Sequence, residues 1–136
     1  MVVGVSAFVA IVFGSVPPAR ASSVSAVTAP TLSSTAAGAT GVAYTGIGFN
    51  LSPTGALTAA STITLTAPPG TTLTGGCDTF VHDDTTGANV GCGGSVSGGG
   101  SVVALDLSTS VAAGDHLSIT LRRVTNPAPG TYSLSV

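Results

Sequence analysis

Short segments in which apolar and polar residues alternate recur along this chain, and Gly, Pro or Asn closes each of them. Alternation with a period of two residues is typical of β-strands that bury one face. About seven such strands in one domain, separated by turn residues, indicate an all-β fold, an immunoglobulin-like antiparallel β-sandwich. The pattern predicts strands at 25–29, 42–51, 61–66, 80–81, 101–107, 117–124 and 131–136.

Two local features refine this prediction. The alternation changes phase between Tyr44 and Ile47, which predicts a β-bulge at Gly46. The sequence Pro-Pro-Gly at 68–70 should end the preceding strand, because proline cannot donate to the ladder. Helices are disfavoured because β-branched residues dominate and 19 Gly and 8 Pro residues interrupt the chain.

The chain opens on an apolar run at 2–16, followed by two prolines and the sequence Ala-Arg-Ala. This arrangement predicts a secretory signal peptide at 1–21, cut after Ala21, and a mature domain at 22–136. The run is shorter than the about 20 residues of a membrane helix. We therefore expect a secreted or cell-surface protein with no membrane span in its mature chain. The absence of Lys and Arg ahead of the run favours a start slightly further upstream.

The charge of the chain limits the partners to be expected. Only 6% of its residues are charged, with no Lys and no Glu, and removal of the signal leaves Arg122 and Arg123 against five Asp. Nucleic-acid binding needs a basic surface that neutralises phosphates, so it is not expected. The apolar fraction of 43% indicates a folded chain, since disordered chains are poor in apolar residues.

Three segments, 52–73, 111–127 and 129–136, carry the motifs S-x-T-G-x-L, P-x-G-T, G-D-x-x-x-I-T-L and T-N-P-x-x-G-T-Y. This combination resembles immunoglobulin-like modules, often in tandem, of secreted bacterial and archaeal surface proteins. The resemblance covers most of the mature chain and implies a spacer, stalk or adhesive module. The chain departs from the pattern between Cys77 and Cys92, in the glycine tract that follows, and in having one module only.

Cys77 and Cys92 are the only cysteines. In an exported chain, two cysteines are expected to form a disulfide. The bridge would close a loop of about 15 residues, and loop closure of this length stabilises a fold by roughly 3 kcal/mol according to chain entropy. A zinc site would need more cysteine or histidine partners nearby than the sequence offers.

Oxygen and nitrogen donors gather inside this loop at Asp78, His82, Asp83 and Asp84. Such a cluster is a weak candidate for a metal site, because carboxylates and imidazole bind Ca²⁺ and transition metals. The sequence has no EF-hand spacing or nonapeptide repeat, and Asp-Asp-Thr-Thr-Gly is also typical of a polar hairpin turn. We favour the turn and expect neither a metal nor a cofactor.

Catalysis by Ser, His and Asp is a further possibility, because His82 and His116 accompany many serines and five aspartates. No G-x-S-x-G motif marks a nucleophile. The glycine tract at 91–100 lacks the Lys-Ser/Thr ending of a phosphate-binding loop and should be a flexible loop. We expect no enzyme activity.

The sequence thus favours a non-catalytic structural or interaction module whose partners are envelope or extracellular proteins or neighbouring modules. Its recognition surface is expected at 74–100, or at an exposed edge strand at 131–136. The alternative is a small free secreted protein that uses the Cys77–Cys92 loop to bind carbohydrate, protein or a metal-dependent ligand. Phe80 beside that loop is a weak candidate contact. The predicted last strand runs to Val136, so we equally expect that this chain is a fragment of a longer, multi-module protein.

Overall fold

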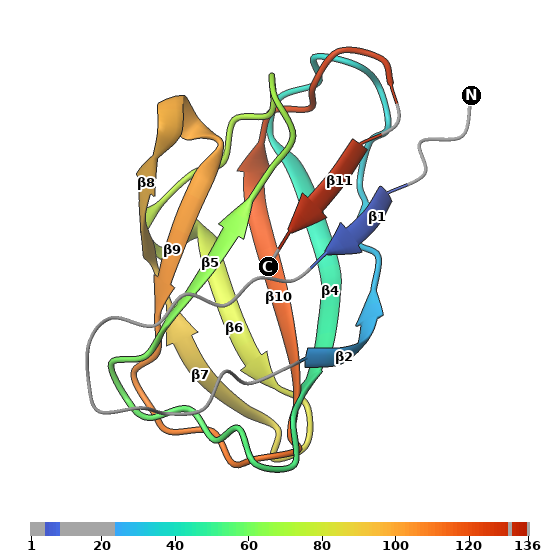
Figure 1. Ribbon diagram of the computed structural model, residues 1–136. Helices are drawn as coiled ribbons and strands as arrows, with labels where there is room; N and C mark the ends of the chain where they lie inside the picture. Colours follow the sequence, from blue (N-terminus) through green and yellow to red (C-terminus); the bar gives the residue numbers. More distant parts are fainter. Residues whose placement is uncertain (1–4, 9–23, 131, 136) are drawn as a thin grey trace.

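Two β-sheets face each other in the computed structural model of this chain, which describes residues 5–8, 24–130 and 132–135 (Figure 1). The first sheet has the order β1 (Val5–Phe8), β11 (Tyr132–Ser135), β5 (Thr62–Thr66), β9 (Val102–Asp106) and β8 (Gly94–Ser97). The second has the order β2 (Val24–Thr28), β4 (Val42–Leu51), β10 (His116–Val124), β6 (Thr79–Asp83) and β7 (Ala88–Cys92), with β3 (Thr31–Leu32) also pairing with β4. The strands pair antiparallel except β1 and β11. The predicted all-β sandwich is confirmed.

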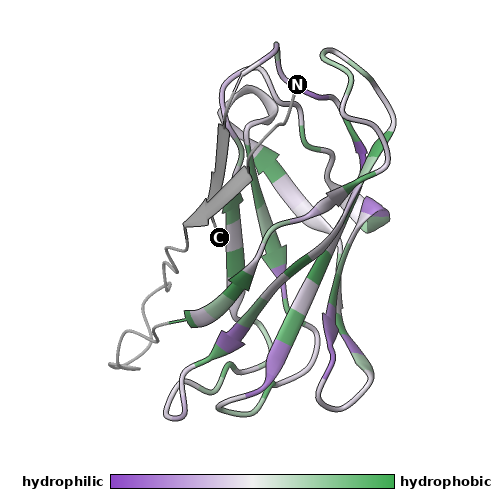
Figure 2. Ribbon diagram, turned by 90° about the vertical axis from the view of Figure 1, so that its right-hand side faces the viewer, coloured by the Kyte–Doolittle hydropathy of each residue, from purple (hydrophilic) through white to green (hydrophobic). Residues whose placement is uncertain are grey.

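The core lies between the sheets and follows the predicted alternation, which Figure 2 shows as green and purple bands along the strands. In β10, Leu117, Ile119 and Leu121 are buried, whereas Ser118 and Thr120 between them are partly exposed. Burial of one such aliphatic side chain stabilises the fold by about 1.5–3 kcal/mol. The largest fully buried side chains are those of Phe49, Ile47, Leu51, Ile63, Leu65, Leu105, Leu117, Ile119 and Leu121.

Two register shifts interrupt the pairing of β4 with β10 in the second sheet. The predicted bulge at Gly46 is confirmed, because the register of β4 and β10 shifts there and Gly46 has a φ of 73°. A second shift lies between Leu121 and Val124 of β10, where Arg123 has a φ of 57°. Because of this bulge, Arg122 and Arg123 are both exposed rather than on opposite faces.

The glycine tract at 91–100 is not the flexible loop that the sequence predicts. It contains the end of β7, the whole of β8 and the single-turn 3₁₀-helix η2 (Gly98–Gly100). The backbones approach closely here: a Cβ on Gly91 would lie 2.9 Å from the backbone oxygen of Asp106. Only glycine permits this approach, so these strands lack the alternation that reveals the others.

The predicted signal peptide lies mostly outside the described residues. Within it, β1 pairs parallel with β11, from Val5 opposite Tyr132 to Phe8 opposite Ser135. By contrast, β11 pairs with β5 at Ser135 and Thr66 alone. Cleavage after Ala21 would therefore remove the main neighbour of β11. The signal peptide itself stays a prediction.

Candidate functional site

Strand β6 carries the predicted donor residues to two different sides of the second sheet. Successive side chains of a strand point to opposite faces. Asp83 accordingly faces the interior with 2% exposure, while His82 and Asp84 lie on the outer face and are partly exposed. The donors that are adjacent in the sequence are therefore separated by the fold.

On the outer face, both histidines of the chain meet one carboxylate. Nδ1 of His82 lies 2.9 Å from Oδ1 of Asp84, and Nε2 of His116 lies 3.5 Å from Oδ2. The hydroxyl of Ser118 donates to Oδ1 of Asp84 at 2.9 Å. Sheet register brings these side chains together, since Ser118 of β10 lies opposite His82 of β6. We call these four residues the outer cluster.

The outer cluster favours the charged form of its carboxylate. Partial burial raises the pKa of Asp84, but hydrogen bonds with His82 and Ser118 and the charges of both histidines lower it by more. The pKa of Asp84 therefore lies below that of an ordinary aspartate. On the far side of His116, Nδ1 lies 2.5 Å from Oδ1 of Asn50 on β4, so the cluster links three strands.

The order of groups in the outer cluster differs from that of a catalytic triad. A triad places histidine between serine and aspartate, so that the imidazole takes the hydroxyl proton. Here Asp84 lies between Ser118 and the two histidines, and the serine hydroxyl donates to the carboxylate. This arrangement joins β6 to β10 and leaves the Ser118 hydroxyl bonded to the carboxylate.

The four weak metal candidates point to three places. Asp78 lies 3.4 Å from Arg123, Asp83 faces inward, and His82 and Asp84 contact each other. Within residues 5–8, 24–130 and 132–135, no three His, Cys, Asp or Glu side chains are arranged to hold a metal ion.

Asp83 organises the predicted hairpin turn. Its Oδ1 accepts hydrogen bonds from the backbone N–H groups of Thr85 and Thr86, and its Oδ2 accepts one from the Thr86 hydroxyl. The turn spans residues 84–87 and closes with Gly87 at a φ of 76°. The prediction of a polar turn at this point is confirmed.

The two cysteines lie side by side at the start of β6 and the end of β7. Cys77 belongs to the 3₁₀-helix η1 (Gly76–Asp78), and its Sγ lies 2.8 Å from Sγ of Cys92. Both side chains are exposed as thiols. The hydrogen bond with Cys92 raises the pKa of the Cys77 thiol. The disulfide stays a prediction.

Phe80 is half-buried beside this pair, opposite Cys92 in the sheet. The guanidinium carbon of Arg122 lies 4.9 Å from the ring centroid, which is a cation–π geometry. The exposed Arg122 therefore covers the ring. A partner that contacts this surface would meet the guanidinium and the ring together.

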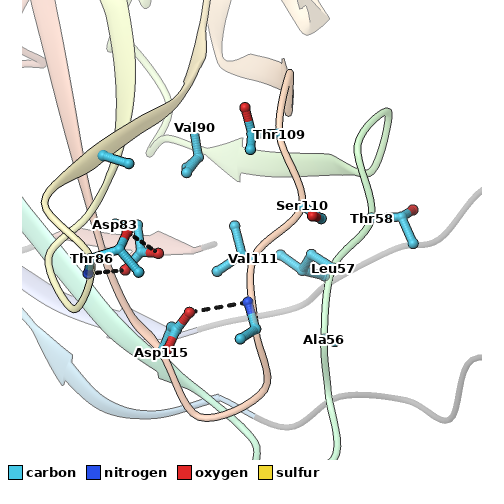
Figure 3. Close-up of a pocket in the computed structure, with 12 residues that line it drawn as sticks. Ala56, Leu57, Thr58, Asp83, Thr86, Val90, Thr109, Ser110, Val111 and Asp115 are labelled. Carbon is cyan, nitrogen blue, oxygen red and sulfur yellow. Dashed lines mark hydrogen bonds between the residues drawn. The ribbon is translucent and has the colours of Figure 1, made fainter.

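Sequence reasoning missed a pocket of about 550 Å³ at the end of the sandwich that lies at the bottom of Figure 1. The loop before β5, the β6–β7 hairpin and the loop before β10 form it, and Leu57, Asp83, Val90, Val111 and Asp115 are among its lining residues (Figure 3). We call it the end pocket. The signal that could have indicated it is the alternation in β6, which places Asp83 inward like Val81.

Comparison of this chain with protein-family models, with curated proteins and with solved structures finds no match. The immunoglobulin-like resemblance therefore stays an expectation. In the part of the chain that the structure describes, no helix is long and apolar enough to cross a membrane.

Proposed function

We propose that this chain is a non-catalytic structural or interaction module, a spacer or adhesive unit with an immunoglobulin-like fold, of a secreted or cell-surface protein. The observation that carries the proposal is the outer cluster. Its serine, histidines and aspartate, the residue types that catalysis would use, bond to one another across β6 and β10. In this arrangement their polar groups bond to one another and hold β6 and β10 together.

Export supports the same proposal. The apolar run at 2–16 has the features of a signal peptide, and the cysteine pair suits an oxidising compartment. The thiols of Cys77 and Cys92 are 2.8 Å apart and exposed, so an oxidant can reach them. In such a compartment a bridge would fasten η1 to β7. Adhesion and a cell-surface position follow from the resemblance described above.

A second candidate is a small free secreted protein that binds a ligand at the Cys77–Cys92 loop. The observation that favours it is the contact of Arg122 with Phe80 next to the cysteines. An exposed arginine over an aromatic ring offers both charge and apolar surface to a carbohydrate or a protein. A spacer needs no such surface, so loss of carbohydrate or protein binding in Arg122→Ala would favour the ligand-binding candidate over a spacer.

The experiment that tests export and catalysis uses the full chain expressed in a bacterial host with secretory machinery. We expect it outside the cytoplasm with Ser22 as its first residue, measured by mass spectrometry. Purified protein should hydrolyse ester and peptide substrates no faster than Ser118→Ala protein, since both then lack a catalytic centre. Because the apolar run lacks a preceding Lys or Arg, a second version carries a basic segment ahead of it, and retention of both versions in the cytoplasm would refute export. Hydrolysis that Ser118→Ala removes would refute the non-catalytic assignment.

A further inference from the structure

The end pocket combines apolar walls with two carboxylates that are almost completely buried. Leu57, Val90 and Val111 supply aliphatic surface. Asp83 is 2% exposed and Asp115 is 9% exposed. Buried charge is costly unless it is paired or hydrogen-bonded, so the hydrogen-bond partners of each carboxylate decide what the pocket can bind.

Hydrogen bonds within the described residues satisfy Asp83 but reach Asp115 at one oxygen. Both oxygens of Asp83 accept bonds from its own hairpin turn. Asp115 accepts the backbone N–H of Ala112 at Oδ2, 3.0 Å away, and among residues 5–8, 24–130 and 132–135 no donor reaches its Oδ1. A carboxylate has about four lone-pair positions, so Asp115 retains acceptor capacity at the pocket (Figure 3).

The described basic side chains lie elsewhere. Arg122 covers Phe80 and Arg123 contacts Asp78. Along β10 they lie about 23 and 26 Å from Asp115, at about 3.3 Å per residue. Both distances exceed the screening length of about 8 Å at physiological ionic strength. The two histidines contact Asp84 on the opposite face of the sheet.

We propose that the end pocket binds a primary alkylammonium group, with the ammonium at Asp115 and the alkyl chain along Leu57 and Val111. The ammonium supplies three N–H donors and the positive charge that the pocket lacks. The alkyl chain would lie against the aliphatic side chains of the wall, but the charge of the ammonium decides binding. Ca²⁺ fits less well, because it takes six to eight oxygen ligands and the pocket offers two carboxylates. Asp83 and Val90 belong to the Cys77–Cys92 loop, but the pocket lies at the turn end of the β6–β7 hairpin, away from the two cysteines, so its test is separate from that of the proposed function.

The test is an NMR titration of ¹⁵N-labelled full chain with n-pentylamine and with Nα-acetyl-lysine methylamide. We expect saturable shifts of the Val111, Ala112 and Asp115 amides, and none with 1-pentanol, which has the same chain without the charge. Binding of n-pentylamine without binding of the lysine derivative indicates that the ligand is a free small molecule. Binding of the lysine derivative as well indicates a lysine side chain of a partner protein, and both results support the proposal.

Two variants and one control locate the site. Asp115→Asn keeps the acceptor for Ala112 but removes the charge, and should weaken amine binding about tenfold, which corresponds to about 1.4 kcal/mol. Thr109→Lys, at an exposed lining position, places a tethered ammonium at the pocket and should weaken binding equally, even if Asp115→Asn does not fold. Asp106→Asn, an exposed carboxylate on β9, should bind as the unchanged chain does.

Several results would overturn the proposal. The proposal is wrong if neither amine shifts these amides saturably, or if 1-pentanol shifts them as much as the amines do. It is also wrong if Thr109→Lys and every folded carboxylate variant bind the amine with unchanged affinity. Displacement of the amine by CaCl₂ at equal concentration would assign the pocket to a metal ion instead.

Discussion

The hydroxyl of Tyr44 donates a hydrogen bond to Oδ1 of Asn126 at 2.8 Å, across 82 positions of the sequence and inside the core. The amide nitrogen of Asn126 in turn donates to the backbone oxygens of Ser34 and Ala36, each at 2.9 Å. Asn126 is 5% exposed. One buried amide therefore fastens the segment before β4 to the end of β10, and it belongs to the T-N-P motif, which in sequence looks like a turn signal only.

Tyr44→Phe should lower the free energy of unfolding by about 1–2 kcal/mol, because it leaves Oδ1 of Asn126 buried without its donor. Urea denaturation followed by circular dichroism measures this. Thr62→Val is the matched control, since it removes an exposed hydrogen bond to Asp106 and should change stability by no more than about 0.5 kcal/mol. Equal losses in the two variants would contradict the role assigned to the buried amide.

Gly94→Ala should destabilise the fold more than Gly46→Ala, although only Gly46 has a positive φ. At Gly46 a Cβ meets open space, so the cost is conformational strain of about 1 kcal/mol. At Gly94 it would lie 2.9 Å from Cδ2 of Leu105 and closer still to the backbone oxygen of Ala104, which forces β8 away at a cost of about 2 kcal/mol. Thermal unfolding of both variants measures the order, and the reverse order would contradict the close packing of β8.

The strands that bury one face could be predicted from the sequence, and the glycine-rich ones could not. Ile47 and Phe49 of β4 alternate with exposed or small residues, so their period is visible. In β7 and β8 the inward positions include Gly91 and Gly94, which fill their space with neighbouring backbone and leave no apolar signal. The alternation rule fails where a backbone takes the place of a side chain.

The candidate site was only partly predictable for a different reason. The sequence placed His82, Asp83 and Asp84 together, but a strand separates neighbours and joins residues from other strands. His116 reaches Asp84 and Asp115 joins the pocket of Asp83 through the pairing of β10 with β6. Strand order decides these contacts, and strand order cannot be read from local alternation.

Acid should destabilise this protein partly through Asp84. The pKa of Asp84 is lowered in the folded state, so its contribution to stability is present above its ordinary pKa and is lost as the pH falls through the lowered value. Below about pH 4, the melting temperature of Asp84→Asn should therefore fall less steeply than that of the unchanged chain. Asp106→Asn removes an exposed carboxylate of β9 and serves as the control. Parallel curves for the unchanged chain and Asp84→Asn would contradict the lowered pKa.

Oxidation should join Cys77 to Cys92 and stabilise the β6–β7 hairpin. Closing a loop of about 15 residues contributes about 3 kcal/mol in the chain-entropy estimate. A thiol assay on air-oxidised protein should find no free thiol, and dithiothreitol should lower its melting temperature. The double variant Cys77→Ser, Cys92→Ser should have the melting temperature of the reduced protein, and dithiothreitol should not change it. Persistent free thiols after oxidation would contradict the bridge.

Removal of residues 1–21 tests what β1 contributes. The described core extends from Val42 to Val124, so the chain 22–136 should fold, with unfolding free energy reduced by roughly 1 kcal/mol through loss of an edge strand. Because β11 pairs at four positions with β1 and at one with β5, its amides should exchange faster in the shortened chain, while those of β4 and β10 stay protected. Hydrogen exchange with mass spectrometry measures both. Failure of 22–136 to fold would show that β1 is a required strand, which is incompatible with its removal as a signal peptide.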